Sequence, residues 1–222
     1  MKGKVVFITG SSLGIGRETA FKFAEEGSKI IVTYYKDKKY AFDVAKKCME
    51  LGASDVLVLG LNLMDNKNIK DCVENIVKKF GKIDILINNS GVISWKLLKE
   101  QTFEEIEEQI RTNLEGLIKV TKECLPYIGE AVINVASGAG KSAYADLSTY
   151  CATKFGVRGF TQSLAEELPK IRVFAINPGM TATRMTGFKG TPPEEVAKVI
   201  INVAKGKIKP DSERDVDVWE YV

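Results

Sequence analysis

Short apolar runs alternate along the chain with longer segments in which apolar residues recur at helical spacing. The runs cover residues 4–9, 29–34, 55–61, 84–88, 131–136 and 172–177, and the alternating residues 216–222 suggest a seventh. Runs that stay apolar, without a polar residue at every second position, are typical of parallel strands covered on both faces. We therefore expect a buried parallel sheet.

The segments between the runs predict helices. Ala20, Phe23 and Ala24 recur at helical spacing after the first run, and Gly27 marks the end of that helix. Further helices are expected near 37–51, 66–80, 103–127, 149–168 and 193–205. The repeated strand–helix order predicts an α/β fold, a doubly wound, Rossmann-like parallel β-sheet with helices on both faces. Because no linker rich in Pro, Gly or Ser interrupts the chain, we expect a single domain over residues 1–222.

In a sheet of this kind ligands bind at the carboxyl ends of the strands. The first run leads into Thr-Gly-Ser-Ser-Leu-Gly-Ile-Gly, residues 9–16. Glycines let a loop approach a pyrophosphate closely, and the helix behind them offers free N–H groups. The spacing is not that of a P-loop, and a turn that serves only packing is the alternative. We expect a nucleotide-binding loop.

Polar residues also follow the fourth, fifth and sixth runs. Asn-Asn-Ser-Gly, residues 88–91, follows the fourth run, and Ser137 follows the fifth. The sixth run leads into the turn Pro178–Gly179 and the hydroxyls of Thr181 and Thr183. Each of these segments, taken alone, is also typical of an ordinary turn or connecting loop.

The segment 148–160 places a tyrosine and a lysine, Tyr150 and Lys154, one helical turn apart, so the two side chains share a face. A free phenol has a pKa near 10, and a neighbouring ammonium favours the phenolate. Lowering this pKa by about three units requires roughly 4 kcal/mol. The chain has no histidine, which excludes histidine bases and Ser-His-Asp triads. The pair is therefore a candidate acid–base catalyst, with a solvated surface lysine as the alternative.

The composition bears on possible partners, metal sites and cellular location. The 222 residues carry a formal net charge of only +3, which gives no case for nucleic acid or an anionic membrane surface as a partner. Four scattered cysteines form no CxxC pair, so we expect no metal site and a reducing, cytoplasmic location. The first apolar run is too short for a signal peptide, and no stretch approaches the ~20 apolar residues that span a bilayer.

Together the motifs resemble the short-chain dehydrogenase/reductase family over nearly the whole chain. The matching segments are Thr9–Gly16, Asn88–Gly91, Ser137, Tyr150 with Lys154, and Pro178–Gly179. The resemblance implies an NAD(P)(H)-dependent oxidoreductase that interconverts a carbonyl and a secondary alcohol, with a 3-oxoacyl compound or a general small ketone or alcohol as substrate.

The resemblance also assigns roles to individual residues. Tyr150 would be the general acid or base, Ser137 would orient the carbonyl, and Lys154 would bind the nicotinamide ribose and lower the pKa of Tyr150. Asn113 matches the asparagine that holds a water in the family's proton relay, and a buried amide bonded to its own helix is the alternative.

By the same resemblance a larger set of residues would contact the cofactor: Gly10, Ser12, Leu13, Gly14, Ile15, Gly16, Tyr34, Tyr35, Lys36, Asn62, Leu63, Asn89, Ser90, Gly91, Tyr150, Lys154, Pro178, Gly179, Thr181 and Thr183. An acidic residue at the end of the second strand would select NAD, but Lys36 lies there, and a cation favours the 2′-phosphate of NADP(H). Leu13 stands where NADP-dependent relatives often carry a base, and Asp37 follows Lys36. We favour NADP(H), with NAD(H) as the alternative.

The segment that follows Gly179 is shorter than is usual in the family, which predicts a clipped substrate lid and an open pocket. We expect its walls to include Trp95, Tyr144, Met180 and Met185. The helices at 103–127 and 149–168 would pair two subunits into a homodimer. Two other functions stay open: a relative of the sugar-nucleotide epimerases and dehydratases, and a non-catalytic nucleotide-sensing protein on the same fold.

Overall fold

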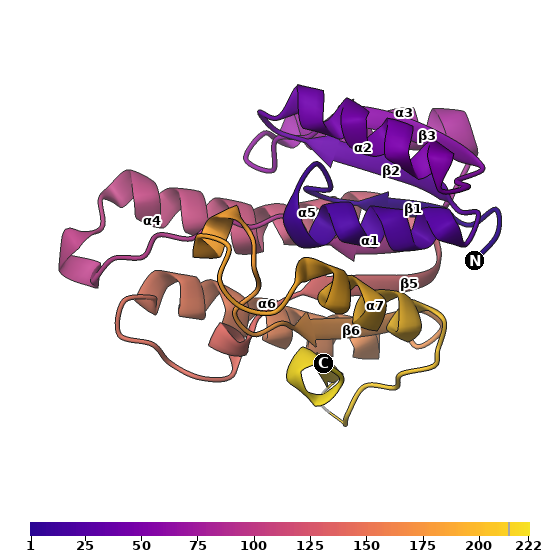
Figure 1. Cartoon of the computed structure of the whole chain (residues 1–222). Coiled ribbons are helices and arrows are strands. Elements are labelled where there is room, and N and C mark those ends of the chain that lie inside the picture. Colours follow the sequence, from indigo (N-terminus) through magenta and orange to yellow (C-terminus); the bar gives the residue numbers. More distant parts are fainter. Residues whose placement is uncertain (213) are drawn as a thin grey trace.

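Parallel strands form one sheet in the order β3-β2-β1-β4-β5-β6-β7 within residues 1–212 and 214–222, which the computed structural model describes (Figure 1). The strands are β1 (Val5–Ile8), β2 (Lys29–Tyr34), β3 (Asp55–Gly60), β4 (Ile83–Asn88), β5 (Ile128–Val135), β6 (Arg172–Asn177) and β7 (Asp215–Asp217). This arrangement confirms the doubly wound α/β fold that the alternating pattern predicts.

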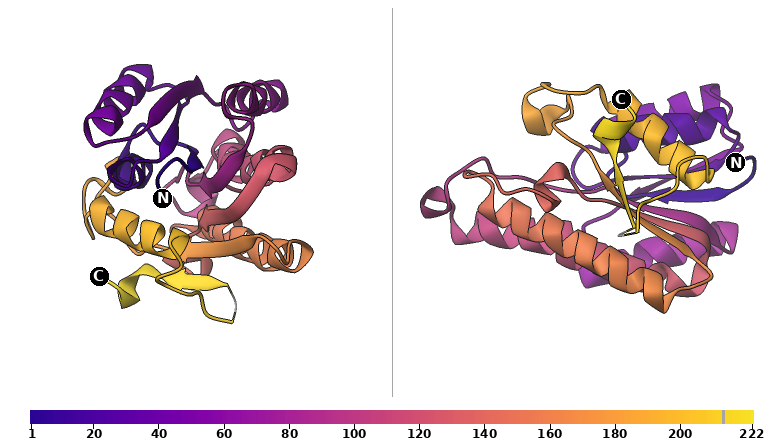
Figure 2. Two further views of the ribbon diagram at one scale, coloured as in Figure 1. Left: turned by 90° about the vertical axis from the view of Figure 1, so that its right-hand side faces the viewer. Right: turned by 90° about the horizontal axis from the view of Figure 1, so that it is seen from below.

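Helices cover both faces of the sheet. They are α1 (Gly14–Glu25), α2 (Lys38–Glu50), α3 (Asn66–Phe80), α4 (Phe103–Ile110), α5 (Leu117–Cys124), α6 (Ser148–Glu167) and α7 (Pro193–Ala204). Figure 2 shows α1, α2 and α7 on one face and α3, α5 and α6 on the other, whereas α4 projects beyond the sheet. The ends of the strands near α4 are therefore not covered by the two helical layers.

Alternate side chains of each strand enter different cores. Val6 and Ile8 of β1 pack with α1, α2 and α7, whereas Val5 and Phe7 pack with α3, α5 and α6. All four are buried, as expected for a central parallel strand covered on both faces. The continuous apolar runs of the sequence thus correspond to strands that have no solvent face.

The direction of winding reverses between β1 and β4. β1 pairs with β2 on one side and with β4 on the other, in register at Ile8 and Ile87. The loops that follow these two neighbouring strands lead to helices on opposite faces of the sheet, which opens a crevice at their carboxyl ends. Ligands of doubly wound sheets bind at such a point.

Two predicted elements were wrong in their extent. The helix expected at 103–127 is interrupted by a π-helical turn, Arg111–Gly116, and ends in the 3₁₀ helix Leu125–Tyr127. The wide turn lets the side chain of Asn113 bond the backbone of Val92 in a neighbouring loop rather than its own helix.

The strand suggested at 216–222 is only Asp215–Asp217, followed by the 3₁₀ helix Val218–Glu220. Its partner β6 ends at Asn177, and Pro178 has no N–H with which to extend the ladder.

Candidate active site

A cavity of about 1040 Å³ lies at the carboxyl ends of the strands. Its walls contain most of the predicted cofactor and catalytic positions, namely Gly10, Ser12, Leu13, Gly14, Ile15, Tyr35, Lys36, Asn62, Leu63, Asn89, Ser90, Gly91, Ser137, Tyr150, Lys154, Pro178, Gly179, Thr181 and Thr183. The four predicted pocket residues, Trp95, Tyr144, Met180 and Met185, line it too. Segments that are far apart in the sequence thus converge on one space.

Three predicted positions lie outside these walls. Gly16 lies beneath the glycine loop, where an added Cβ would be 2.5 Å from both Asn89 Nδ2 and Gly10 O. Tyr34 packs against the core on the α1 side, and Asn113 is fully buried behind the loop after β4. Tyr34 and Gly16 thus make packing contacts and do not line the cavity, and their contact with a cofactor stays a prediction.

The glycine loop leads straight into the first helix. Gly14 begins α1 with φ of +55°, a conformation that side chains disfavour, and Leu13 before it has no side-chain oxygen to cap the helix. The first-turn N–H groups are thus left for another acceptor, and a helix N-terminus attracts anions. This arrangement fits a pyrophosphate, as the sequence predicts.

The side-chain amide nitrogens of Asn88 and Asn89 donate to protein groups. Asn88 Nδ2 donates to Thr121 Oγ1 and to Asn134 Oδ1, both at 2.8 Å. Asn89 Nδ2 donates to the carbonyls of Thr9 and Gly10 at 2.9 and 3.1 Å. These bonds of Asn89 attach the loop after β4 to the glycine loop, so the two loops form one continuous wall of the cavity.

Ser137 and Tyr150 meet inside the cavity. Ser137 lies two residues after the end of β5 and accepts a hydrogen bond from Ala139 N at 3.1 Å. Tyr150 lies in the first turn of α6 and is 8% exposed. Burial raises the pKa of the Tyr150 phenol to about 12, although a hydrogen bond with Ser137 acts in the opposite direction. The phenol is therefore neutral at pH 7.

Lys154 is buried deep beside this pair. Its Nζ donates to Val135 O at 2.9 Å and lies 5.6 Å from the centroid of the Tyr150 ring. Burial lowers the pKa of Lys154 to about 8.

The expectation that the neighbouring lysine lowers the pKa of Tyr150 is thus wrong for the protein without a cofactor. Both side chains leave water on folding, and for each of them desolvation is the largest influence on the pKa. The shared helix face that the spacing predicts is nonetheless present, and the lysine is not a solvated surface residue.

Asn113 connects the π-helical turn to this site. Its Oδ1 accepts from Val92 N at 2.8 Å, and its Nδ2 donates to Val92 O at 2.8 Å and to Thr153 Oγ1 at 3.3 Å. Gly91 lies between Asn113 and Lys154. A Cβ added to Gly91 would be 3.4 Å from Asn113 Oδ1 and 3.8 Å from Lys154 Nζ. Asn113 thus holds the loop that passes in front of Lys154.

The segment after β6 forms a lid over the cavity, defined here as residues 180–190. It contains the 3₁₀ helix Arg184–Thr186. On the substrate side, Trp95 Nε1 donates to Met185 O at 2.9 Å. At the glycine loop, an added Cβ on Gly14 would be 3.2 Å from Thr183 Cγ2. The lid is short, as expected, yet it contacts both walls.

The far end of the cavity lies beyond β2 and β3. Lys36 and Asn62 face it, as predicted. Asn62 Oδ1 accepts from Met64 N at 3.1 Å, and its amide nitrogen has no hydrogen-bond acceptor among the residues that the structure describes. Two arginines that the sequence motifs do not single out, Arg17 and Arg184, line the same space. Glu18, Asp37 and Asp43 line it as well, and Arg17 is paired with Glu18 at 2.7 Å, so charges of both signs surround this end.

Comparison with known proteins decides the family. Residues 4–193 match the family model of the short chain dehydrogenases. The chain belongs to the short-chain dehydrogenase family. This short-chain dehydrogenase is 36% identical over 228 residues to a 3-oxoacyl-[acyl-carrier-protein] reductase of Thermotoga maritima, covering 92% of this chain and 91% of the relative. A reductase of the same description from Staphylococcus aureus is 35% identical over 189 residues, covering 82% and 76%.

Solved structures agree with the fold of the short-chain dehydrogenase. A short chain dehydrogenase from Burkholderia cenocepacia, solved in complex with NADP, superposes with a TM-score of 0.90 at 24% identity and covers 97% of this chain and 96% of the other. An alcohol dehydrogenase from Thermococcus sibiricus, complexed with 5-hydroxy-NADP, gives 0.88 at 25% identity, with 97% and 96% covered. The family model and the reductases that the chain is similar to make it an NAD(P)-dependent enzyme of this family, which contradicts the non-catalytic alternative.

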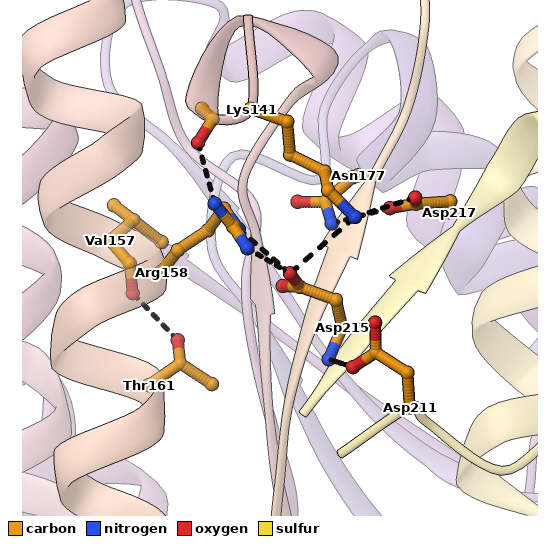
Figure 3. A network of polar contacts seen from close by, with 9 residues as sticks. Lys141, Val157, Arg158, Thr161, Asn177, Asp211, Asp215 and Asp217 are labelled. Atoms are coloured by element: carbon orange, nitrogen blue, oxygen red, sulfur yellow. Dashed lines mark hydrogen bonds and ion pairs between the residues drawn. The ribbon is translucent and has the colours of Figure 1, made fainter. Parts of the chain in front are cut away.

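A network of polar contacts joins α6, the segment 140–141 and β7 in this short-chain dehydrogenase (Figure 3). Arg158 of α6 donates from Nε to Asp215 Oδ2 at 2.8 Å and from Nη1 to Gly140 O at 2.9 Å. Lys141 Nζ bonds Asp217 Oδ2 at 2.7 Å. Gly140 and Lys141 lie three and four residues after Ser137, so the network joins the Ser137 loop to β7.

Among residues 1–212 and 214–222, no helix is long and apolar enough to cross a membrane.

Proposed function

We propose that this short-chain dehydrogenase is an NADP(H)-dependent reductase that interconverts a ketone and a secondary alcohol, with a 3-oxoacyl thioester as the first substrate to test. The convergence of Ser137, Tyr150 and Lys154 in one buried cavity carries the proposal. The activity named for the relatives from Thermotoga maritima and Staphylococcus aureus supports the substrate class.

The nicotinamide cofactor, when bound, supplies or accepts the hydride. In reduction, the Tyr150 hydroxyl would donate its proton to the carbonyl oxygen, and Ser137 Oγ would donate a hydrogen bond to the same oxygen. Because the pKa of Tyr150 is about 12 in the free protein, the phenol starts in the protonated form that reduction requires. Alcohol oxidation reverses the transfer, with Tyr150 as the base.

Lys154 and Asn113 would prepare the site rather than react. Lys154 Nζ donates one of its three hydrogen bonds to Val135 O, and its other N–H groups could donate to a ribose hydroxyl of the cofactor. Asn113 bonds both backbone groups of Val92, so it holds the wall against which Lys154 lies. We propose Asn113 as a positioning residue.

The residues predicted to contact the cofactor lie at two places along the cavity. The N-terminus of α1 behind Gly10 and Gly14 would hold the pyrophosphate, and the Lys36 and Asn62 end would hold the adenosine. No carboxylate of the described residues is ion-paired with Lys36, whose Nζ lies over the Tyr35 ring at 5.1 Å. An unpaired ammonium supports recognition of the 2′-phosphate and hence NADP(H) over NAD(H).

The test follows oxidation of NADPH and of NADH by absorbance with acetoacetyl thioesters and a panel of small ketones. Tyr150→Phe should abolish turnover and leave the Kd for NADPH within about twofold, because the hydroxyl is lost and the ring is kept. Tyr127→Phe, outside the cavity, is the matched control and should remain fully active. Turnover by Tyr150→Phe at the wild-type rate would remove Tyr150 from its assigned role.

We also propose a homodimer through α4, α5 and α6. Phe103 is 87% exposed, and Ile110 and Phe155 are 44% and 45% exposed, on the helices that the sequence marks for pairing. Burial of such side chains favours association. Sedimentation equilibrium should give twice the mass of 24.5 kDa, and a monomer at micromolar concentration would contradict the proposal.

A further inference from the structure

The lid is pinned at its base. Thr181 and Thr191 form an isolated parallel bridge, with Thr191 N donating to Met180 O at 2.9 Å and Ala182 N donating to Thr191 O at 2.8 Å. Because these two strands of the loop are joined, the tip between them projects as one unit. Arg184 is the cationic side chain of that tip which lines the cavity.

Arg184 reaches across the cavity to α2. Its guanidinium carbon lies 4.9 Å from the centroid of the Tyr40 ring, and its Nη1 lies 3.8 Å from Asp37 Oδ1. Tyr40 is in the first turn of α2, and Asp37 immediately precedes that helix. The lid thus touches the segment that also carries Lys36.

The ion pair between Arg184 and Asp37 is weak. The side chains are 52% and 40% exposed, and at 3.8 Å the contact is longer than a charge-assisted hydrogen bond. The guanidinium therefore keeps most of its donors available for a better acceptor. A phosphate monoester carries close to two charges and three acceptor oxygens, and it would outcompete one exposed carboxylate.

The contact between Arg184 and Asp37 also affects which cofactor this end of the cavity would favour. A carboxylate beside Lys36 would repel a 2′-phosphate, and a carboxylate at this end of β2 would suit the ribose diol of NAD instead. With Arg184 against it, the charge of Asp37 is offset, and the local balance of Lys36, Asp37 and Arg184 is positive.

We propose that Arg184 is a second recognition group for the 2′-phosphate of NADP(H), and that this contact holds the lid over the substrate pocket. The inference rests on the proposed function for the cofactor site and adds a residue from the lid to it. Met185 follows Arg184 and accepts the Trp95 indole N–H. The same 3₁₀ helix therefore joins the phosphate end of the cavity to the substrate side.

Calorimetric titration with NADP⁺ and NAD⁺ tests the recognition. Arg184→Ala should raise the Kd for NADP⁺ about tenfold and the Kd for NAD⁺ by less than about twofold, because a half-exposed charged contact is lost only for the phosphorylated cofactor. The matched control is Lys189→Ala, which removes an exposed lid cation that does not line the cavity and should leave both Kd values unchanged.

The outcomes separate this inference from the proposed function. If Arg184→Ala weakens NADP⁺ and NAD⁺ equally, the arginine binds a group that both cofactors share and the inference fails, whereas the cofactor site stands. An unchanged Kd for NADP⁺ overturns the inference as well. If wild-type protein binds neither dinucleotide, the proposed function fails with it.

Hydrogen exchange provides a readout that needs no turnover. Saturating NADP⁺ should slow amide exchange in residues 180–190 more than saturating NAD⁺ does, and Arg184→Ala should remove that difference while Lys189→Ala keeps it. Equal protection by the two cofactors in the wild type would contradict the proposed link between phosphate and lid.

Discussion

Removing one partner of the pair formed by Arg158 and Asp215 should destabilise the fold unusually strongly. The Asp215 side chain is 1% exposed and that of Arg158 12%, and the guanidinium bonds Oδ2 through two nitrogens (Figure 3). Lys141 Nζ is more distant from the same oxygen, at 3.8 Å. Arg158→Leu would thus leave a buried carboxylate with one remote cation.

The expected cost follows from that burial. Breaking a buried ion pair by removing one partner destabilises proteins by about 3–5 kcal/mol, because the remaining charge stays desolvated. This is a large part of the roughly 5–15 kcal/mol that holds a domain folded. Replacing both residues by leucine removes the uncompensated charge, so we expect the double variant to be more stable than Arg158→Leu.

Urea unfolding followed by circular dichroism measures these differences. The control is Lys67→Ala, which removes a partner from the pair with Asp71, a 3.4 Å contact whose lysine is 87% exposed. It should change the free energy of unfolding by less than about 1 kcal/mol. The reasoning is refuted if Arg158→Leu costs no more than Lys67→Ala, since burial would then not govern the energy of the pair.

Two further predictions concern the site. Burial lowers the pKa of Lys154 to about 8 from 10.5, so the unfolded state binds one more proton between these values and wild-type stability should rise with pH there. Relative to Lys154→Met, unfolding in urea at pH 7 and pH 10 should show a gain of up to about 3 kcal/mol, and a constant difference would contradict the buried ammonium. Gly16→Ala should destabilise by about 1–3 kcal/mol, because its Cβ would lie 2.5 Å from Gly10 O. Thermal melts should show Gly159→Ala, whose Cβ meets nothing within 4 Å in α6, to be neutral or stabilising, and equal effects of the two changes would disprove the steric argument.

The apolar runs predicted the sheet well because burial on both faces leaves a direct record in the sequence. β1 is a continuous apolar run and is buried throughout, and β4 is buried throughout although it contains Asp84 and Asn88, whereas the edge strand β3 is only half-buried. The order of the polar segments placed Ser137, Tyr150 and Lys154 in one cavity, since the carboxyl ends of parallel strands share an edge.

Other features depend on contacts between distant segments, which local patterns do not contain. The helical period at 103–127 gives no sign of the π-helical turn, because Asn113 bonds to Val92, 21 residues earlier in the chain. The pKa of Tyr150 is raised because the side chain is deeply buried, and spacing along a helix does not reveal how deeply a residue is buried. Arg184 belongs to no motif, and only the folded lid brings it to Tyr40.

The dependence of the Ser137 loop on β7 makes the shape of this loop sensitive to the edge of the sheet. β7 has only three residues and lies at the edge of the sheet, where it pairs with β6 alone. It supplies the carboxylates that hold Arg158 and Lys141, so local opening of this edge would release both side chains. We therefore expect the segment that carries Ser137 to loosen together with β7 before the centre of the sheet unfolds.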